Sequence, residues 1–263
     1  MVKKKKKKRV VAISDPHCGH RIGLTPPDYA PRNTSKWYAP GRALWGEYKR
    51  MIKERKAQCP IDVLLVTGDT IDGRGKKSGS TELIEVDRKV QCEMAAACIL
   101  EWEAKEVVMV FGTAYHVGSK EDNEETVAGL VNARKIGGQE WVKVDDVMFD
   151  LKHFVGGSGI PHGAGTPLAK EWLWNLVWNS RGEQPKADIF LRGHQHAFNY
   201  IGNDSFLAMT LPALQGLGSK FGTRIPSKRV DFGIVYFDVE GSKYTWDWDI
   251  VTVKAQKPKV LQF

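Results

Sequence analysis

The stretch Val-Leu-Leu-Val-Thr-Gly-Asp-Thr-Ile-Asp, residues 63–72, joins an aliphatic run to a Gly-Asp-x-x-Asp motif. The run predicts a buried strand, and the motif places two carboxylates at its carboxyl end. Aspartate and histidine clusters follow three other aliphatic runs in the same way: Asp15-Pro16-His17 after Val10–Ile13, Gly112–His116 after Val107–Phe111, and Gly193-His194-Gln195-His196 after Ile189–Leu191. Side chains of this kind at the carboxyl ends of several strands indicate the catalytic edge of an α/β sheet.

The rest of the chain alternates between strand and helix patterns. Helical spacing and capping signals predict four helices, over residues 42–56, 81–104, 126–135 and 166–181. Residues 141–144 and 147–155 are predicted to form a hairpin around Asp145-Asp146. After the last helix, strands are predicted over residues 189–191, 206–211, 232–239 and 244–253. We therefore expect one α/β domain, residues 10–263, with a two-sheet core and helices outside. Residues 1–9 are expected to form a basic, disordered tail.

Positive charge is concentrated at the N-terminus. Lys3–Lys8 and Arg9 carry seven of the eight net positive charges, so the remaining chain is nearly neutral. A neutral body argues against an extended basic face for nucleic acid, and leaves the tail either as a solvated segment or as a weak nucleic-acid arm. The apolar runs are too short for a transmembrane segment, and the four cysteines lack CxxC spacing. We expect a cytoplasmic protein with reduced thiols and no membrane partner.

The spacing within the clusters suits metal binding. Residues i and i+2 of an extended chain point the same way, so both side chains of Asp-x-His or His-x-His can reach a metal centre. A capping aspartate and a surface histidine would explain one such cluster alone, but not four in order. Carboxylates with several imidazoles suit two divalent ions such as Mn²⁺, Zn²⁺, Fe or Ni²⁺. Two metals about 3.5–4 Å apart stabilise the attacking and leaving oxygens of a phosphoryl displacement.

In this order the motifs resemble those of the calcineurin-like metallophosphoesterase superfamily, over residues from about 9 to at least 200. The resemblance implies a four-layer fold, a two-sheet β-sandwich core flanked by helices, with a dinuclear metal centre at the strand ends. It implies that Asp15, His17 and His196 bind the first metal. Asp69 would bridge both metals, with His153 and His194 on the second. A metal-bridging hydroxide would attack phosphorus in line, and a histidine would protonate the leaving alkoxide.

Two positions depart from the superfamily pattern. Thr113 stands where the third motif usually has a ligating Asn, and His116 lies two residues beyond the usual acid histidine. We assign His116 as the general acid, and Thr113 and Asp72 either as ligands or as supports for them. The superfamily also has a ligating histidine before the Gly193–His196 cluster, and two residues match it: His153 ends a predicted strand, whereas His162-Gly163 matches the expected dipeptide in a loop. We favour His153 as the ligand, since strand ends position ligands better than loops.

The predicted function is that of a metal-dependent phosphoesterase, with a phosphodiesterase or nuclease favoured over a phosphatase. The alternatives are a phosphomonoesterase, a catalytically silent binding or scaffold module of the same fold, and a nucleic-acid-binding protein with structural metals. His162 and Arg192 are predicted substrate contacts, and His20 a surface histidine. Three tryptophans of the 166–181 helix, Trp172, Trp174 and Trp178, are predicted to lie in the core or against a second copy in a homodimer.

Overall fold

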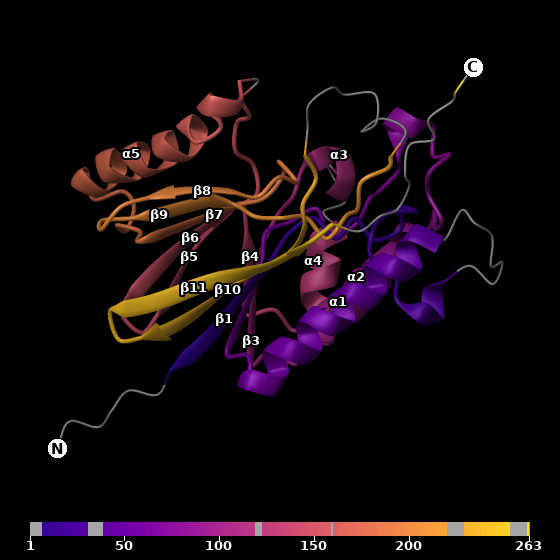
Figure 1. Ribbon diagram of the computed structural model, residues 1–263, viewed down its shortest axis with the longest axis horizontal. Coiled ribbons are helices and arrows are strands. Elements are labelled where there is room, and N and C mark those ends of the chain that lie inside the picture. The colour runs from indigo at the N-terminus through magenta and orange to yellow at the C-terminus, as the bar shows by residue number, and fades with distance from the viewer. Residues whose placement is uncertain are drawn as a thin grey trace.

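Two β-sheets stacked face to face, with helices on both outer sides, form the protein (Figure 1). A computed structural model describes residues 7–30, 39–118, 123–158, 160–219, 229–252 and 262. The predicted α/β fold with a two-sheet core is confirmed. Within the described residues, no helix combines the length and the apolar character that crossing a bilayer requires.

The first sheet carries three of the four predicted clusters at one edge. Its strand order is β11-β10-β1-β2-β3-β4. The strands are β1 (Lys8–Ile13), β2 (Val63–Val66), β3 (Glu106–Val110), β4 (Lys135–Gly137), β10 (Phe232–Glu240) and β11 (Lys243–Val251). The first four are parallel, and Ile13 pairs with Val66, which in turn pairs with Met109. Because β1, β2 and β3 end level with one another, the polar residues that follow them meet at one edge.

The second sheet has the order β5-β6-β7-β9-β8. Its strands are β5 (Gln139–Val144), β6 (Val147–Lys152), β7 (Ile189–Arg192), β8 (Asn199–Gly202) and β9 (Leu207–Thr210). Strands β6, β7 and β9 are parallel, and Lys152 pairs with Arg192. His153 and Gly193 therefore leave their strands at the same level.

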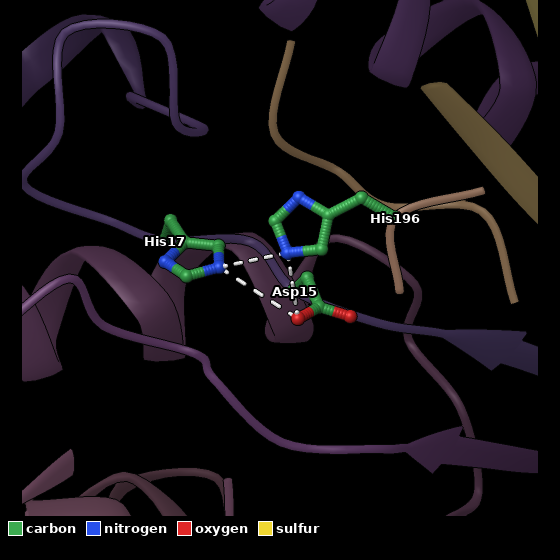
Figure 2. Close-up of side chains that lie close together, drawn as sticks. All are labelled: Asp15, His17 and His196. Carbon is green, nitrogen blue, oxygen red and sulfur yellow. Dashed lines mark hydrogen bonds and ion pairs between the residues drawn. The ribbon is translucent and has the colours of Figure 1, made fainter. Parts of the chain in front are cut away.

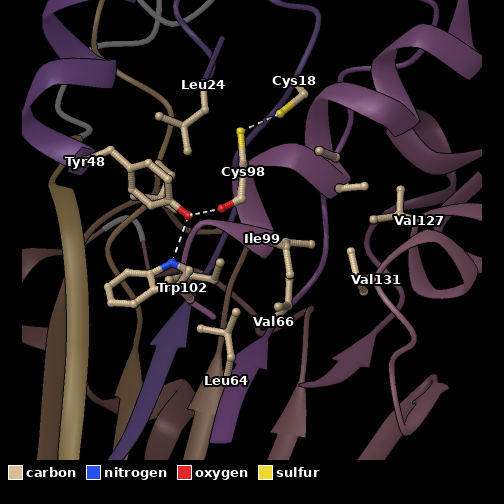
Figure 3. Close-up of a cluster of buried hydrophobic side chains, with 14 of the residues drawn as sticks. Cys18, Leu24, Tyr48, Leu64, Val66, Cys98, Ile99, Trp102, Val127 and Val131 are labelled. Carbon is tan, nitrogen blue, oxygen red and sulfur yellow. Dashed lines mark hydrogen bonds between the residues drawn. The ribbon is translucent and has the colours of Figure 1, made fainter. Parts of the chain in front are cut away.

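Three apolar clusters hold the layers together. The cluster between the sheets combines aliphatic residues of β1, β2 and β3 with Phe149, Leu151 and Leu191 of the second sheet. The outer face of the first sheet packs under α1 (Ala39–Gln58), α2 (Arg88–Leu100) and α4 (Asn123–Leu130). Figure 3 shows part of this layer, where buried Tyr48, Trp102 and Cys98 meet. The outer face of the second sheet packs under α5 (Thr166–Ser180).

Short elements connect these layers. They are α3 (Ala114–Val117) and the 3₁₀ turns η1 (Pro27–Tyr29), η2 (Lys76–Ser78) and η3 (Pro161–Gly163). The predicted start of α2 at residue 81 is wrong, because Asp87 caps the helix by accepting a hydrogen bond from the Lys89 N–H (2.8 Å). The predicted end of the next helix at Lys135 is also wrong, because Lys135 begins β4. Strands β4 (Lys-Ile-Gly) and β8 (Asn-Tyr-Ile-Gly) contain no aliphatic run, so they give no clear strand pattern.

The boundary of the basic tail also needs correction. Lys8 and Arg9 belong to β1, and the buried Arg9 guanidinium donates to both carboxylate oxygens of Asp238, from Nε (2.6 Å) and Nη2 (3.0 Å). An arginine held between strands is structural rather than part of a tail. Residues 1–6 lie outside the described residues.

Helix α5 buries only one side. Trp172 stacks on Phe206 at a centroid distance of 4.3 Å, whereas Trp174 on the opposite side is 56% exposed. Leu173 and Val177 are exposed beside it. The expectation that the tryptophans lie in the core therefore fails for the outer face of α5, because the helix covers the sheet with a single stripe. A homodimer through residues 166–181 stays a prediction.

Candidate metal centre

Asp15, His17 and His196 converge at the ends of β1 and β7 (Figure 2). The fully buried Asp15 carboxylate has its Oδ1 atom 3.1 Å from His196 Nε2 and 3.7 Å from His17 Nε2. The two Nε2 atoms are 3.3 Å apart. His196 lies 181 residues after Asp15 in the chain, and the stacking of the two sheets brings them together.

A second group combines Asp69 with His153 and His194. His153 Nδ1 lies 2.6 Å from the Thr67 carbonyl oxygen, and His153 Nε2 lies 3.1 Å from Asp69 Oδ2. The carbonyl accepts a hydrogen bond from Nδ1–H, which directs Nε2 toward Asp69. Among the described residues, the buried Nε2 atom has no hydrogen-bond partner apart from this ion-pair contact with Asp69.

Asp69 belongs to two groups of ligand atoms. It lies with His153 and His194 in one, and with His17 and His116 in the other. Asp69 Oδ1 also accepts hydrogen bonds from the backbone N–H of Thr113 (2.6 Å) and from its Oγ1 (3.1 Å). Thr113 therefore orients the central carboxylate.

Backbone geometry aims these side chains away from their strands. Asp15, His17, Asp69, His194 and His196 all have positive φ angles, between 45° and 68°. Such angles are uncommon for residues other than glycine and cluster at functional sites. Beside Asp69, the backbones touch: a Cβ on Gly112 would lie 2.2 Å from the Asp69 nitrogen. Only glycine permits that approach.

Charges within the centre are strongly coupled. Burial opposes ionisation of Asp69, but His153, His116 and His17 together outweigh it and lower the pKa of Asp69 to about 2. Burial likewise opposes a charge on His17, yet hydrogen bonds to Asp15 and Asp72 raise its pKa to about 10. The pKa of His153 rises to about 9, against its burial, because Asp69 and Asp15 face it. The buried carboxylates thus demand positive charge, here supplied by protons.

The donor set fits divalent cations. Carboxylate oxygens and imidazole nitrogens are the ligands that Zn²⁺, Mn²⁺ and Fe share, and His153 Nε2, 3.1 Å from Asp69 Oδ2, is placed to bind the same cation as that carboxylate. Asp72 Oδ1 lies 3.1 Å from His17 Nδ1, opposite the Nε2 atom that faces Asp15. A carboxylate on the far nitrogen fixes the tautomer of a ligating histidine. Asp72 therefore supports His17.

His116 lies beside this centre. Its Nδ1 atom is 2.9 Å from the Asp72 carbonyl oxygen, and its ring meets the His17 ring edge-on at a centroid distance of 4.5 Å. Burial and the adjacent His17 lower the pKa of His116. With Nδ1 engaged, Nε2 is the atom available to a substrate or to a cation.

A cavity of about 310 Å³ opens over the centre. Its walls include the imidazoles of His17, His116 and His194, and also Ser78, Leu217 and Arg229. The cavity therefore extends well beyond the cluster of ligand atoms, with room for an organic group next to a phosphoryl group.

Two predicted substrate contacts lie elsewhere. Arg192 is 0% exposed, and its guanidinium pairs with Glu171 (2.8 Å) and Asp150 (3.2 Å) beneath α5, so the prediction for Arg192 is wrong. A strand-terminal arginine resembles an anion-binding residue in sequence, and only packing reveals its partners. His162 is exposed on η3 and is absent from the cavity wall and from the metal-ligand groups of the described residues.

Other residues at the site carry no sequence signal. His20, predicted at the surface, is 5% exposed and lines the cavity together with Glu82, 3.8 Å away. Glu124 is fully buried behind Asp69 and accepts hydrogen bonds from Thr70 and Gly112. At the start of a helix, Glu124 resembles an ordinary first-turn acid, so nothing short of the tertiary structure marks it.

No protein-family model and no curated protein matches the chain. Similar solved structures include a novel archaeal phosphodiesterase, with 11% identity, coverage of 91% of this chain and 99% of the other, and a TM-score of 0.47. Vps29 of Entamoeba histolytica complexed with Zn²⁺ has 14% identity, 92% and 98% coverage, and a TM-score of 0.45. A predicted phosphoesterase of Streptococcus pneumoniae has 11% identity, 92% and 89% coverage, and a TM-score of 0.40.

Proposed function

We propose that this protein is a metal-dependent phosphoesterase that hydrolyses phosphodiesters at a dinuclear centre. The observation that carries the proposal is the position of Asp69. Its buried carboxylate takes part in two groups of ligand atoms, one with His153 and His194 and one with His17 and His116. A carboxylate in that position is suited to bridging two cations.

Each cation would have its own ligands. Asp15, His17 and His196 would hold the first, His153 and His194 the second, and Asp69 both. Bound divalent ions supply Lewis acidity, which activates water at neutral pH and offsets charge on the phosphoryl oxygens. Thr113 donates to Asp69, so the second cation would have three protein ligands and an open position, as catalytic sites do.

His116 would act on the leaving group. It lines the cavity at the edge of the ligand cluster, and a protonated imidazole there can donate a proton to an alkoxide. The lowered pKa of His116 makes its protonated form a stronger acid. The cavity beyond His116 accommodates a second ester substituent, which favours diesters such as nucleotides or nucleic acid over monoesters.

A catalytically silent binding module is the second candidate. The observation that favours it is Thr113, whose hydroxyl lies within hydrogen-bond distance of both Asp69 oxygens, at 3.1 and 3.2 Å. A threonine engaged in this way adds no ligand, so the second cation would bind more weakly. The complete set of Asp and His side chains favours the enzyme.

The test is hydrolysis of bis-p-nitrophenyl phosphate and p-nitrophenyl phosphate by metal-free protein, with Mn²⁺, Zn²⁺, Ni²⁺ or Mg²⁺ added back. We expect metal-restored cleavage of the diester in preference to the monoester. A monoester preference would replace the diester proposal by a phosphatase. Tight metal uptake without turnover on either substrate would favour the silent module.

A further inference from the structure

Glu124 is a buried carboxylate directly behind the candidate centre. It is the second residue of α4 and has no exposed surface. Glu124 Oε1 accepts hydrogen bonds from the backbone N–H (2.8 Å) and the hydroxyl (2.9 Å) of Thr70, and Oε2 accepts one from the Gly112 N–H (2.6 Å). One carboxylate therefore joins the loop after β2, the loop after β3 and helix α4.

Both loops position Asp69. Thr70 is its neighbour in the chain, and Gly112 precedes Thr113, whose N–H donates to Asp69 Oδ1 (2.6 Å). Glu124 thus holds the backbone on one side of Asp69 and, through Gly112, the hydrogen-bond donor on the other. A shift of either loop would move the carboxylate that belongs to both ligand groups.

A purely structural role accounts poorly for a carboxylate at this position. Burying an acid carries a large desolvation cost, and burial together with the nearby Asp69 raises the pKa of Glu124 to about 7. A carboxylate can accept all three hydrogen bonds, whereas an amide oxygen could serve only one of the two loops. The negative charge behind Asp69 also favours cations in the centre.

We infer that Glu124 is a positioning residue that fixes Asp69 and Thr113 in the arrangement needed for Asp69 to bridge two divalent cations. This inference rests on the proposed function, because it presupposes that the centre takes up metal. Residues that hold metal ligands in place change metal affinity by about 10- to 100-fold when they are replaced.

The experiment is calorimetric titration of metal-free protein with Mn²⁺, without substrate. Glu124→Gln keeps the shape of the side chain but turns one acceptor into a donor facing a backbone N–H. We expect its Mn²⁺ affinity to fall by about 10-fold or more. Glu125→Gln is the matched control, because Glu125 neighbours Glu124 on α4 and is exposed. We expect the control to bind as the wild type does.

Further readouts separate positioning from support of the fold. A structural role alone would lower the unfolding temperature of metal-free Glu124→Gln and leave the Mn²⁺ affinity of the folded protein unchanged, which would overturn the inference. If Glu124→Gln fails to fold, Thr70→Val replaces it in the test, because this substitution removes only the hydroxyl that donates to Glu124. The inference then requires Thr70→Val to weaken Mn²⁺ binding, by less than the roughly 10-fold expected for Glu124→Gln. Excess Mn²⁺ should restore kcat of either variant. A wild-type protein that takes up no metal would instead contradict the proposed function.

Discussion

Two regions of this protein bury polar groups, and they do so in opposite ways. Under α1 and α2, Trp102 Nε1 donates to the Tyr48 hydroxyl (2.8 Å), which donates to the Cys98 carbonyl oxygen (2.8 Å), with all three residues fully buried (Figure 3). At the strand ends, His17 and His196 bring their Nε2 atoms to 3.3 Å beside Asp15 (Figure 2). In the first network each donor meets a neutral acceptor. In the second, two imidazole nitrogens face each other beside a carboxylate.

The contrast distinguishes support from function. A complete neutral network stabilises the fold and requires nothing from outside. Carboxylates buried beside crowded imidazoles require added positive charge, from protons or from a cation. Substitutions in the two regions should therefore have different consequences: lost stability in the first, and lost metal binding and activity in the second.

The largest expected effect is that of Asp69→Asn. Replacing one oxygen of the central carboxylate by an amide removes the charge shared by both ligand groups, so we expect metal content to fall and turnover to be abolished. Metal analysis and bis-p-nitrophenyl phosphate hydrolysis measure both. Asp204→Asn, in the exposed turn between β8 and β9, is the control. Unchanged activity in Asp69→Asn would contradict the assignment of Asp69 as the ligand shared by both metals.

The second largest effect is expected from His116→Ala, with a loss of about 100-fold in kcat on esters with poor leaving groups. Metal content should be retained, because His116 is assigned to proton donation. His162→Ala provides a histidine control outside the cavity wall. If hydrolysis of an ester with a very good leaving group is lost as well, His116 is a metal ligand rather than the acid.

The stability of metal-free protein should depend on pH. His17 and His153 have folded-state pKa values of about 10 and about 9, above the usual 6.5, so they keep protons that the unfolded chain releases. Their contribution is fully present below about pH 6.5 and is lost as pH rises through 9 to 10. Between about pH 7.5 and 8.5 we expect the unfolding free energy to fall, by about 1 kcal/mol for each histidine.

Urea denaturation in a chelator measures this slope. His17→Gln should reduce it, and saturating Mn²⁺ should flatten it, because a ligating imidazole carries no competing proton. A slope that is the same with and without metal would show that these histidines do not exchange protons for cations.

The smallest effect is expected from Tyr48→Phe in the complete network. Loss of the hydroxyl leaves the Trp102 N–H and the Cys98 carbonyl without their buried partner, at a cost of about 1–3 kcal/mol in unfolding free energy. Chemical denaturation measures it, with Tyr200→Phe as the control on an exposed tyrosine. Mn²⁺ affinity should be unchanged; a weaker affinity would mean that the two regions are coupled.

Sequence patterns predicted correctly the features that depend on residues close together in the chain. The aliphatic runs before Asp15, Asp69 and His194 form strands, and parallel strands in register gather their following residues at one edge. The hairpin at Asp145-Asp146 also forms as expected, with Val144 paired to Val147. Periodicity and turn chemistry suffice for these features because they depend on neighbours in the chain.

Errors arose where a long-range partner decides. Arg192 was expected to face substrate, but Asp150 and Glu171 neutralise it beneath α5. Arg9 was placed in a solvated tail, but Asp238 of β10 holds it in the sheet. The sequence does not show whether a charged side chain will pair with an oppositely charged residue that is distant in the chain.

The sequence by itself determined the alternation of strands and helices and the set of carboxylates and imidazoles at the strand ends. Only the tertiary structure decided which of them meet, because stacking of two sheets brings His153 and His196 against Asp69 and Asp15. It also decided that Asp72, Thr113 and Glu124 support the centre, since hydrogen bonds between loops depend on distances that chain order does not contain. Local patterns specify the ligands, and packing specifies their geometry.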